Sequence, residues 1–72
     1  AQDAAEHPPH DDARVLFRRG AEAYAEERYT EALEAFEASY RAREVPVVLF
    51  NLAQTLRALD RPAEAIEAYR RY

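Results

Sequence analysis

Apolar residues recur at spacings of three and four along most of the chain, which is the pattern of helices that bury one face. The first stripe predicts a helix of about 15 residues that starts after Asp11 or Asp12, since either carboxylate can accept hydrogen bonds from the free amides there. Its members are Ala13, Leu16, Phe17, Gly20, Ala23 and Tyr24. A second stripe predicts a helix over residues 31–43, with Thr30 as its N-cap. This stripe consists of Ala32, Leu33, Phe36, Ser39 and Tyr40.

Residues 45–59 contain signals for both a strand and a helix. The β-branched residues of Val45–Val48 favour a strand. Pro46, however, suits the first turn of a helix, and the stripe after it has helical spacing: Leu49, Leu52, Ala53, Leu56 and Leu59. We therefore predict a third helix, and because Arg57 is its single charged residue, we expect it at the centre of the fold. A fourth helix is predicted to start at Pro62 and to bury Ala65, Ile66 and Tyr69, with Tyr72 as a further candidate. No predicted helix follows that would cover Tyr69 and Tyr72.

The sequence also repeats itself at a fixed interval. The segment 31–36 (EALEAF) returns as 64–69 (EAIEAY), 33 residues later, and Gly20 is matched by Ala53. A fixed period in this range is typical of stacked supersecondary units, each of which buries its apolar face against its neighbour. Because both matched residues are small and lie in the middle of helices, we expect Gly20 and Ala53 to be points where another backbone comes close.

These patterns predict an all-α fold of four helices, arranged as two tandem antiparallel helical hairpins. The predicted organisation is a flexible leader over residues 1–10 and a single domain over 11–72. Within the domain, repeat one spans about 13–45 and repeat two about 46–72, with a truncated final helix.

Composition narrows the classes of function. The net charge of −4 argues against a nucleic-acid partner, and the absence of cysteine excludes disulfides and thiolate metal sites. No apolar run approaches the length needed to cross a membrane. All ten basic residues are Arg, which reflects either codon composition or a use for guanidinium forks in carboxylate binding. The start of the chain, Ala1–Ala5, is typical of a mature exported protein, and a cytoplasmic location is the alternative.

Candidate chemistry is sparse, so we expect no enzyme activity and no cofactor. His7, His10, Asp11 and Asp12 are the only grouped potential metal ligands. Two prolines between the histidines prevent a helical pair, and a solvated tail is the favoured interpretation, with no metal. Ser39 is the single serine, placed at a packing position within a helix, and no nucleophile–base pair can be assembled around it.

Two sets of residues resemble the tetratricopeptide repeat over roughly residues 13–72. The first set is Leu16-Phe17-x-x-Gly20-x-x-x-Tyr24 followed by Tyr29-x-x-Ala32-Leu33-x-x-Phe36. The second is Leu49-Phe50-Asn51-Leu52-Ala53 followed by Ala65-Ile66-x-x-Tyr69. Pro62 departs from the first copy, which has Tyr29 at that position, and the interval is one residue short of the usual 34. Both departures concern the geometry of the loops.

The resemblance implies a non-catalytic protein-interaction scaffold, an α-solenoid fragment whose concave groove accepts a peptide or helix of a protein partner. By position match, the groove is lined by Arg14, Phe17, Arg18, Ala21, Tyr24, Val47, Phe50, Asn51, Gln54 and Arg57. Members of the family can clamp a C-terminal carboxylate with Lys and Asn. Asn51 fits that clamp, but Phe17 and Ala21 stand where a Lys and an Asn are needed, so we expect no clamp here.

Two hypotheses about the partner follow. In the first, Arg14, Arg18 and Arg57 make a basic groove that binds an acidic peptide. The alternative interpretation of these arginines is a solvated helix face with weak ion pairs. The opposite, convex side is expected to carry an acidic row: Glu31, Glu34, Glu37, Glu64 and Glu67. The competing hypothesis is structural self-assembly as a homo-oligomer, with or without a swapped hairpin, in which the end of the stack at Tyr69 and Tyr72 packs on another copy or on further repeats.

Overall fold

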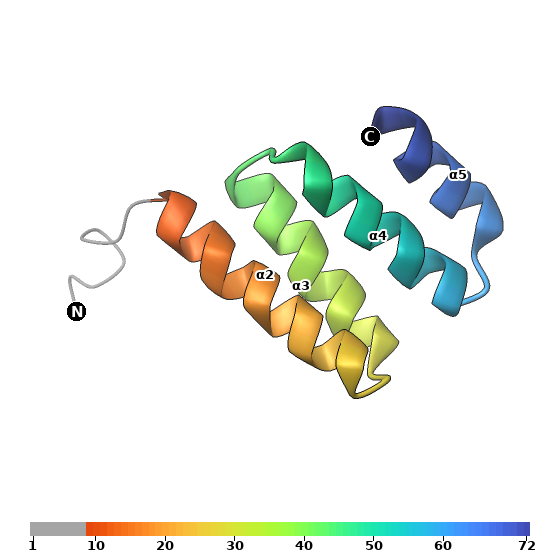
Figure 1. Ribbon diagram of the computed structural model, residues 1–72, viewed down its shortest axis with the longest axis horizontal. Helices are drawn as coiled ribbons and strands as arrows, with labels where there is room; N and C mark the ends of the chain where they lie inside the picture. Colours follow the sequence, from red (N-terminus) through yellow and green to blue (C-terminus); the bar gives the residue numbers. More distant parts are fainter. Residues whose placement is uncertain (1–8) are drawn as a thin grey trace.

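The computed structural model describes residues 9–72, with side chains from Asp12 onward, and this part of the chain folds into four helices (Figure 1). They are α2 (Pro9–Ala25), α3 (Tyr29–Ala42), α4 (Pro46–Ala58) and α5 (Pro62–Arg71). Helices α2 and α3 form one antiparallel hairpin, α4 and α5 form a second, and α3 packs against α4. The prediction of an all-α fold of two stacked hairpins is confirmed, and residues 46–50 are helical. Most of the predicted leader, residues 1–8, lies outside the described residues.

The helix starts differ from two of the sequence-based predictions. Helix α2 starts at Pro9, so Asp11 and Asp12 lie inside its first turn and do not precede it as caps. Helix α3 starts at Tyr29 with Arg28 as its N-cap, so the assignment of Thr30 as N-cap is wrong. The reason lies in the preceding turn, which leads directly into α3 and leaves no extended residue at position 30. Pro46 and Pro62 occupy the first turns of α4 and α5, as predicted.

The two hairpin turns have the same backbone conformation and equivalent backbone hydrogen bonds. Glu27 and Asp60, separated by the sequence interval, are the only non-glycine residues with positive φ among those described, at 63° and 60°. The next amide along, of Arg28 or Arg61, donates to the carbonyl five residues before it, Ala23 or Leu56, over 2.8 and 2.9 Å. Both turns are therefore Schellman motifs, a helix ending that requires one left-handed residue.

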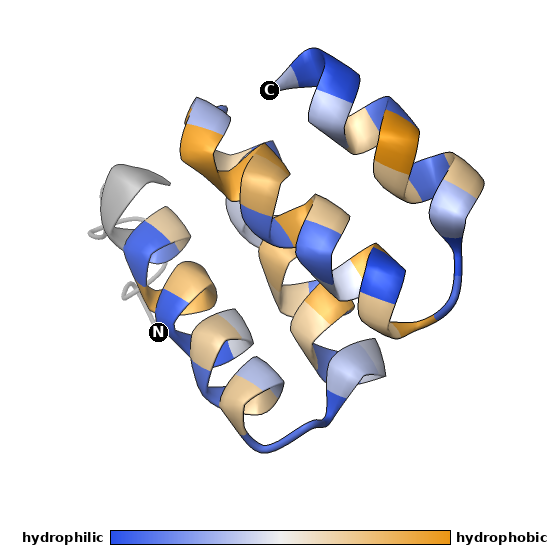
Figure 2. Ribbon diagram, turned by 45° about the vertical axis from the view of Figure 1, so that its right-hand side comes forward, coloured by the Kyte–Doolittle hydropathy of each residue, from blue (hydrophilic) through white to orange (hydrophobic). Residues whose placement is uncertain are grey.

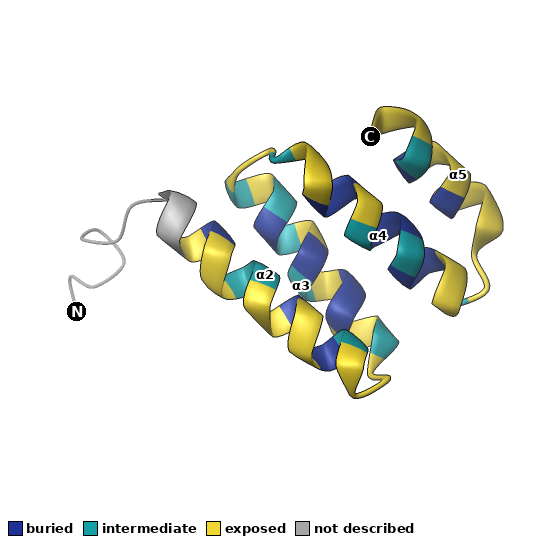
Figure 3. Ribbon diagram, in the orientation of Figure 1, coloured by how far each residue is buried: buried dark blue, intermediate teal, exposed yellow. Residues whose placement is uncertain are grey.

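Helix α4 lies at the centre of the stack, as its low charge predicts. It packs against both α3 and α5, and hydrophobic and buried positions run along its ribbon (Figures 2 and 3). Its buried residues are Val48, Leu49, Leu52, Ala53, Thr55 and Leu56. Together with the buried face of α3, they form one continuous hydrophobic core. Since apolar burial is the main favourable term in folding, α4 is the element that holds the two hairpins together.

The repeat extends to the aromatic core. Phe17 and Phe36 pack with ring centroids 5.4 Å apart, and their repeat mates Phe50 and Tyr69 pack at 6.0 Å. Gly20 is buried as predicted, but its close neighbour is the ring of Phe36 and not another backbone. The expectation of a backbone close approach at Gly20 is therefore wrong. The space that a side chain would need is taken by an aromatic ring of the same hairpin.

Helix α5 buries less than predicted. Ile66 is 51% exposed, so the prediction that it is buried is wrong, and Tyr72, which no described helix covers, is 61% exposed. Tyr69 is partly buried, and Ala68 joins Ala65 in the core instead. The physical reason is position in the stack: the repeat mate of Ile66, Leu33, is 6% exposed because α3 lies beneath α4, whereas no described helix lies beyond α5.

None of the described helices is both long enough and apolar enough to cross a lipid bilayer.

Candidate functional site

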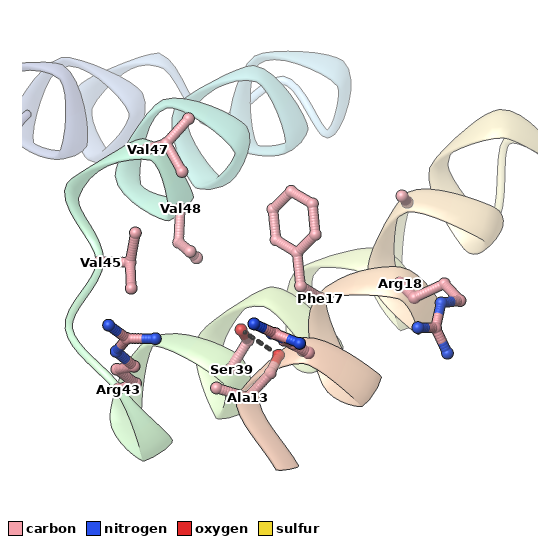
Figure 4. A pocket seen from close by; sticks show the side chains of 10 residues that line it. Ala13, Phe17, Arg18, Ser39, Arg43, Val45, Val47 and Val48 are labelled. Carbon is pink, nitrogen blue, oxygen red and sulfur yellow. Dashed lines mark hydrogen bonds between the residues drawn. The ribbon is translucent and has the colours of Figure 1, made fainter. Parts of the chain in front are cut away.

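A hollow of about 510 Å³ opens between α2 and the start of α4 (Figure 4). It exists because α2 and α4 both pack against α3, which leaves a gap over the end of α3. Its walls come from α2, the end of α3, the loop that follows and the first turn of α4. The lining residues are Ala13, Arg14, Phe17, Arg18, Ala21, Ser39, Arg43, Val45, Val47 and Val48. We call this hollow the arginine pocket.

The interior of the arginine pocket is apolar. The ring of Phe17 stands between α2 and α4, and three valines, at positions 45, 47 and 48, lie across from it (Figure 4). Val47 is 48% exposed, which is unusual for a valine, and Val48 is buried beneath it. The pocket therefore offers a concave apolar surface, the feature that most often marks a binding site for a partner's side chain.

Three guanidinium groups surround this apolar interior. They belong to Arg14 and Arg18 on α2 and to Arg43 at the end of α3, and Figure 4 places Arg43 and Arg18 on either side of Phe17. None of the three forms an ion pair with another residue in the 12–72 range whose side chains are described. Among the residues whose side chains are described, no Asp or Glu lines the pocket. The local charge is therefore positive in a protein whose net charge is −4.

Ser39 fixes the base of the arginine pocket. Its hydroxyl donates a hydrogen bond of 2.8 Å to the backbone carbonyl of Ala13, which joins the end of α3 to the start of α2 (Figure 4). Ser39 is 1% exposed and accordingly has a satisfied, buried hydroxyl. Arg14 directly follows Ala13 on α2, so we expect this bond to help hold Arg14 in place.

Only part of the predicted groove lies at the arginine pocket. Arg14, Phe17 and Arg18 line it, with Ala21 and Val47 beside them. Five predicted groove residues and the two at the predicted self-association end do not line it: Tyr24, Phe50, Asn51, Gln54, Arg57, Tyr69 and Tyr72.

The predicted residues outside the pocket make contacts of their own. Tyr24 packs edge-on against Tyr29 with ring centroids 5.2 Å apart. The ring of Phe50 contacts both Tyr69 and Tyr72 at the α4–α5 end of the groove. The neighbouring phenol of Tyr69 raises the pKa of the Arg57 guanidinium.

The amide of Asn51 donates to the carbonyl of Val47 in its own helix, over 3.0 Å. Asn51, the residue that fits the carboxylate clamp, is thus already engaged by a backbone group.

Sequence reasoning missed Arg43, Val45 and Val48 as pocket residues. They come from the end of α3, the connecting loop and the buried side of α4, segments that a position match to groove-lining helices does not consider. A signal was nevertheless present, because Arg43 and Val45 lie only a few residues before the first turn of α4, where Val47 is placed in the groove.

The metal interpretation of the chain start falls largely outside the described side chains, since His7, His10 and Asp11 are not among them. Within the described part of the chain, no group of three or more His, Cys, Asp or Glu is arranged to hold a metal ion.

Comparison with known proteins identifies the second hairpin. Residues 47–72 match the model of the tetratricopeptide repeat family, and this range covers α4 and α5 almost completely. Searches of curated proteins and of solved structures found no match to this chain. This match supports a tetratricopeptide repeat in the second hairpin, and the four helices are consistent with two such repeats in tandem. Repeats of this family are, in general, protein–protein interaction modules.

Proposed function

We propose that this chain is a non-catalytic module that binds an acidic segment of a partner protein in the groove between α2 and α4. In this proposal an apolar side chain of the partner enters the arginine pocket between Phe17 and Val47. Carboxylates beside it pair with Arg14, Arg18 and Arg43, whose planar guanidiniums suit bidentate contact with carboxylate oxygens.

One observation carries the proposal: three arginines without a described ion pair surround an apolar hollow, and none of the described acidic residues lines it. The chain has a net charge of −4, so a cluster of positive charge has the opposite sign to the protein as a whole. Charge complementarity at the rim of an interface sets partner choice and orientation, while the desolvated apolar centre supplies affinity. An acidic segment with one apolar anchor satisfies both requirements.

A longer partner would continue along α4. Val47, Asn51 and Gln54 are four and three residues apart and so share one face of that helix. Asn51 and Gln54 are partly buried, and the exposed Arg57 follows one turn after Gln54. The partner would then pass from the arginine pocket over the two amides toward Arg57, in keeping with the groove expected from the repeat pattern.

The test uses labelled peptides of about 12 residues, long enough to occupy such a groove, with a central leucine flanked either by glutamates or by lysines. Fluorescence anisotropy should detect binding of the glutamate peptide and not of the lysine peptide. The variant Arg14→Glu/Arg18→Glu should weaken binding by about tenfold or more, since two rim charges are reversed.

The matched control is Arg19→Glu/Arg41→Glu, because these exposed arginines lie on α2 and α3 outside the arginine pocket. Its net charge equals that of the test variant, and it should bind the glutamate peptide within about threefold of the unmodified protein. Equal losses in both double variants, or no loss in either, would contradict the proposal.

A second candidate function is self-association through α5, and the exposure of Ile66 favours it. At the matching position of the first hairpin, Leu33 is buried by the neighbouring hairpin. A second copy covering Ile66, Tyr69 and Tyr72 would complete the same kind of packing. Sedimentation equilibrium at micromolar concentration tests this: a mass above 8.3 kDa that Ile66→Glu returns to 8.3 kDa supports it, and a monomer throughout rejects it.

A further inference from the structure

A second hollow lies on the other side of α4. It measures about 540 Å³, and its walls are α3 with the residues after it on one side and α5 on the other. The lining residues are Glu37, Tyr40, Arg41, Glu44, Leu49, Leu52, Leu56, Glu64, Glu67, Ala68 and Arg71. We call it the acidic cleft. Its floor is a leucine stripe of α4, and its walls are almost entirely polar.

The acidic cleft and the arginine pocket meet α4 on different sides, although the buried Val48 of the pocket and Leu52 of the cleft floor lie one turn apart. Val47, in the arginine pocket, and Leu56, in the cleft floor, are nine residues apart. Nine residues correspond to two and a half turns at 3.6 residues per turn, which places the two side chains on opposite sides of the helix. A partner in one hollow therefore leaves the other accessible.

The charge of the acidic cleft is the reverse of that of the arginine pocket. Four carboxylates line it, two on each wall, against two guanidiniums. Glu64 is already paired with Arg61, with 2.6 Å between the closest atoms. Glu37, Glu44 and Glu67 form no ion pair with any other residue whose side chain the structure describes.

The chain itself indicates which side chain the cleft accepts. The guanidinium of Arg71, on the α5 wall, lies over the ring of Tyr40, on the α3 wall, with 5.4 Å between the guanidinium carbon and the ring centroid. A cation over an aromatic face is a favourable contact, and here it is made inside a ring of carboxylates. A further Lys or Arg from outside would meet three carboxylates that have no described partner.

We propose that the acidic cleft is a second docking surface, for a basic segment of a partner protein whose Lys or Arg side chains flank an apolar one. The carboxylates select a protein over nucleic acid or an anionic membrane surface, because both of those are polyanions that the cleft would repel. With an acidic partner in the arginine pocket, the module would join two partners of opposite charge across a single helix.

The experiment uses a labelled helical peptide of about 14 residues, with leucines on one face and lysines on its flanks, as the probe. The test variant is Glu37→Lys/Glu67→Lys, which places one new cation on each wall. The control variant is Glu22→Lys/Glu34→Lys, whose exposed carboxylates lie outside the cleft and whose change in net charge is identical. Circular dichroism of both variants verifies that helicity is retained.

We expect the lysine peptide to bind the unmodified protein, to lose about tenfold or more in affinity for the test variant, and to lose under about threefold for the control. Equal losses in the two variants would mean attraction to net charge alone and would overturn the proposal, as would the absence of binding at millimolar peptide. The arginine-pocket variant Arg14→Glu/Arg18→Glu should not weaken binding of the lysine peptide. A loss there as large as in the test variant would also overturn the proposal, because it would place the peptide in the other hollow.

Discussion

Gly20 and Phe36 are in such close contact that a Cβ atom on Gly20 would lie 2.7 Å from two carbons of the Phe36 ring. That distance is shorter than carbon atoms tolerate. The ring cannot retreat easily, since Phe36 is 1% exposed and packs against Phe17 on its own hairpin. The single glycine of the chain therefore stands within a helix for a steric reason.

The first prediction concerns Gly20→Ala. In a free helix this change stabilises by about 1 kcal/mol, because alanine has the better helix propensity. Here the new methyl group collides with Phe36, and overpacking of this kind costs about 1–3 kcal/mol. We expect a net loss of about 1 kcal/mol in the free energy of unfolding, measured by urea denaturation.

The control for this prediction changes the ring. In a Phe36→Leu background the collision is removed, so Gly20→Ala should then stabilise the protein relative to Phe36→Leu alone. A stabilising effect of Gly20→Ala in the unmodified protein would show that the ring moves aside at little cost and would refute the steric explanation.

The second prediction concerns the two left-handed turn residues, Glu27 and Asp60. For a residue with a Cβ atom, the left-handed conformation costs about 1 kcal/mol, whereas glycine adopts it without this cost. Glu27→Gly and Asp60→Gly should therefore each raise the free energy of unfolding. The gain should be larger at Glu27, because Asp enters the left-handed region more readily than Glu.

Glu26→Gly is the matched control for the turn. Glu26 directly precedes Glu27 and lacks a positive φ, so glycine there adds freedom to the unfolded chain, removes the exposed ion pair with Arg28 and should destabilise. Urea denaturation of the three variants measures their free energies of unfolding, which should be raised most by Glu27→Gly, raised less by Asp60→Gly and lowered by Glu26→Gly. Stabilisation by Glu26→Gly, or a larger gain at Asp60 than at Glu27, would contradict it.

The fold could be predicted because the same pattern of apolar residues occurs twice in the sequence, once for each hairpin. The stripes around Phe36 and Tyr69 and the prolines at 46 and 62 give the four helices, and the interval between the copies gives their stacking. The errors arise where a local rule competes with a tertiary contact. Thr30 is a good cap by residue type, yet the Schellman turn before it starts α3 at Tyr29.

The site was less predictable, because pockets depend on which faces of several helices meet. The position match to the family's groove put Arg14, Phe17 and Arg18 together, and all three, which lie on one helix, line the arginine pocket. The position match did not indicate Arg43, because the place of Arg43 beside the pocket depends on where α3 ends and on the course of the loop that follows. Nor could the stripe of α5 reveal that Ile66 is exposed, since a stripe indicates an apolar face and not whether anything covers it.

The third prediction concerns pH. The hydrogen bond from the guanidinium of Arg61 lowers the pKa of the Glu64 carboxyl below its ordinary value. A group whose pKa is lower in the folded state favours folding while it is ionised, so its contribution is complete above the ordinary Glu pKa. That contribution is lost as the pH falls through the lowered value. In an NMR titration, Arg61→Gln should move the Glu64 midpoint upward, and an unchanged midpoint would contradict the assignment.

The fourth prediction concerns Ser39→Ala. The Ser39 hydroxyl is the described link between the end of α3 and the Ala13 carbonyl of α2, and it is buried. Removing it should lower the free energy of unfolding by about 1 kcal/mol, because the Ala13 carbonyl keeps its helical partner. Binding of the glutamate peptide should weaken as well, since Arg14 follows Ala13 directly.

Thr55→Ala provides the comparison for Ser39→Ala. Thr55 is also buried, but its hydroxyl donates within α4, to the carbonyl of Asn51 four residues earlier, so it joins no two helices. Its loss should affect stability without changing the affinity for the glutamate peptide. If the two variants weaken peptide binding equally, or if neither weakens it, the Ser39–Ala13 bond does not position the arginine pocket. Urea denaturation and peptide anisotropy on the same samples separate the two effects.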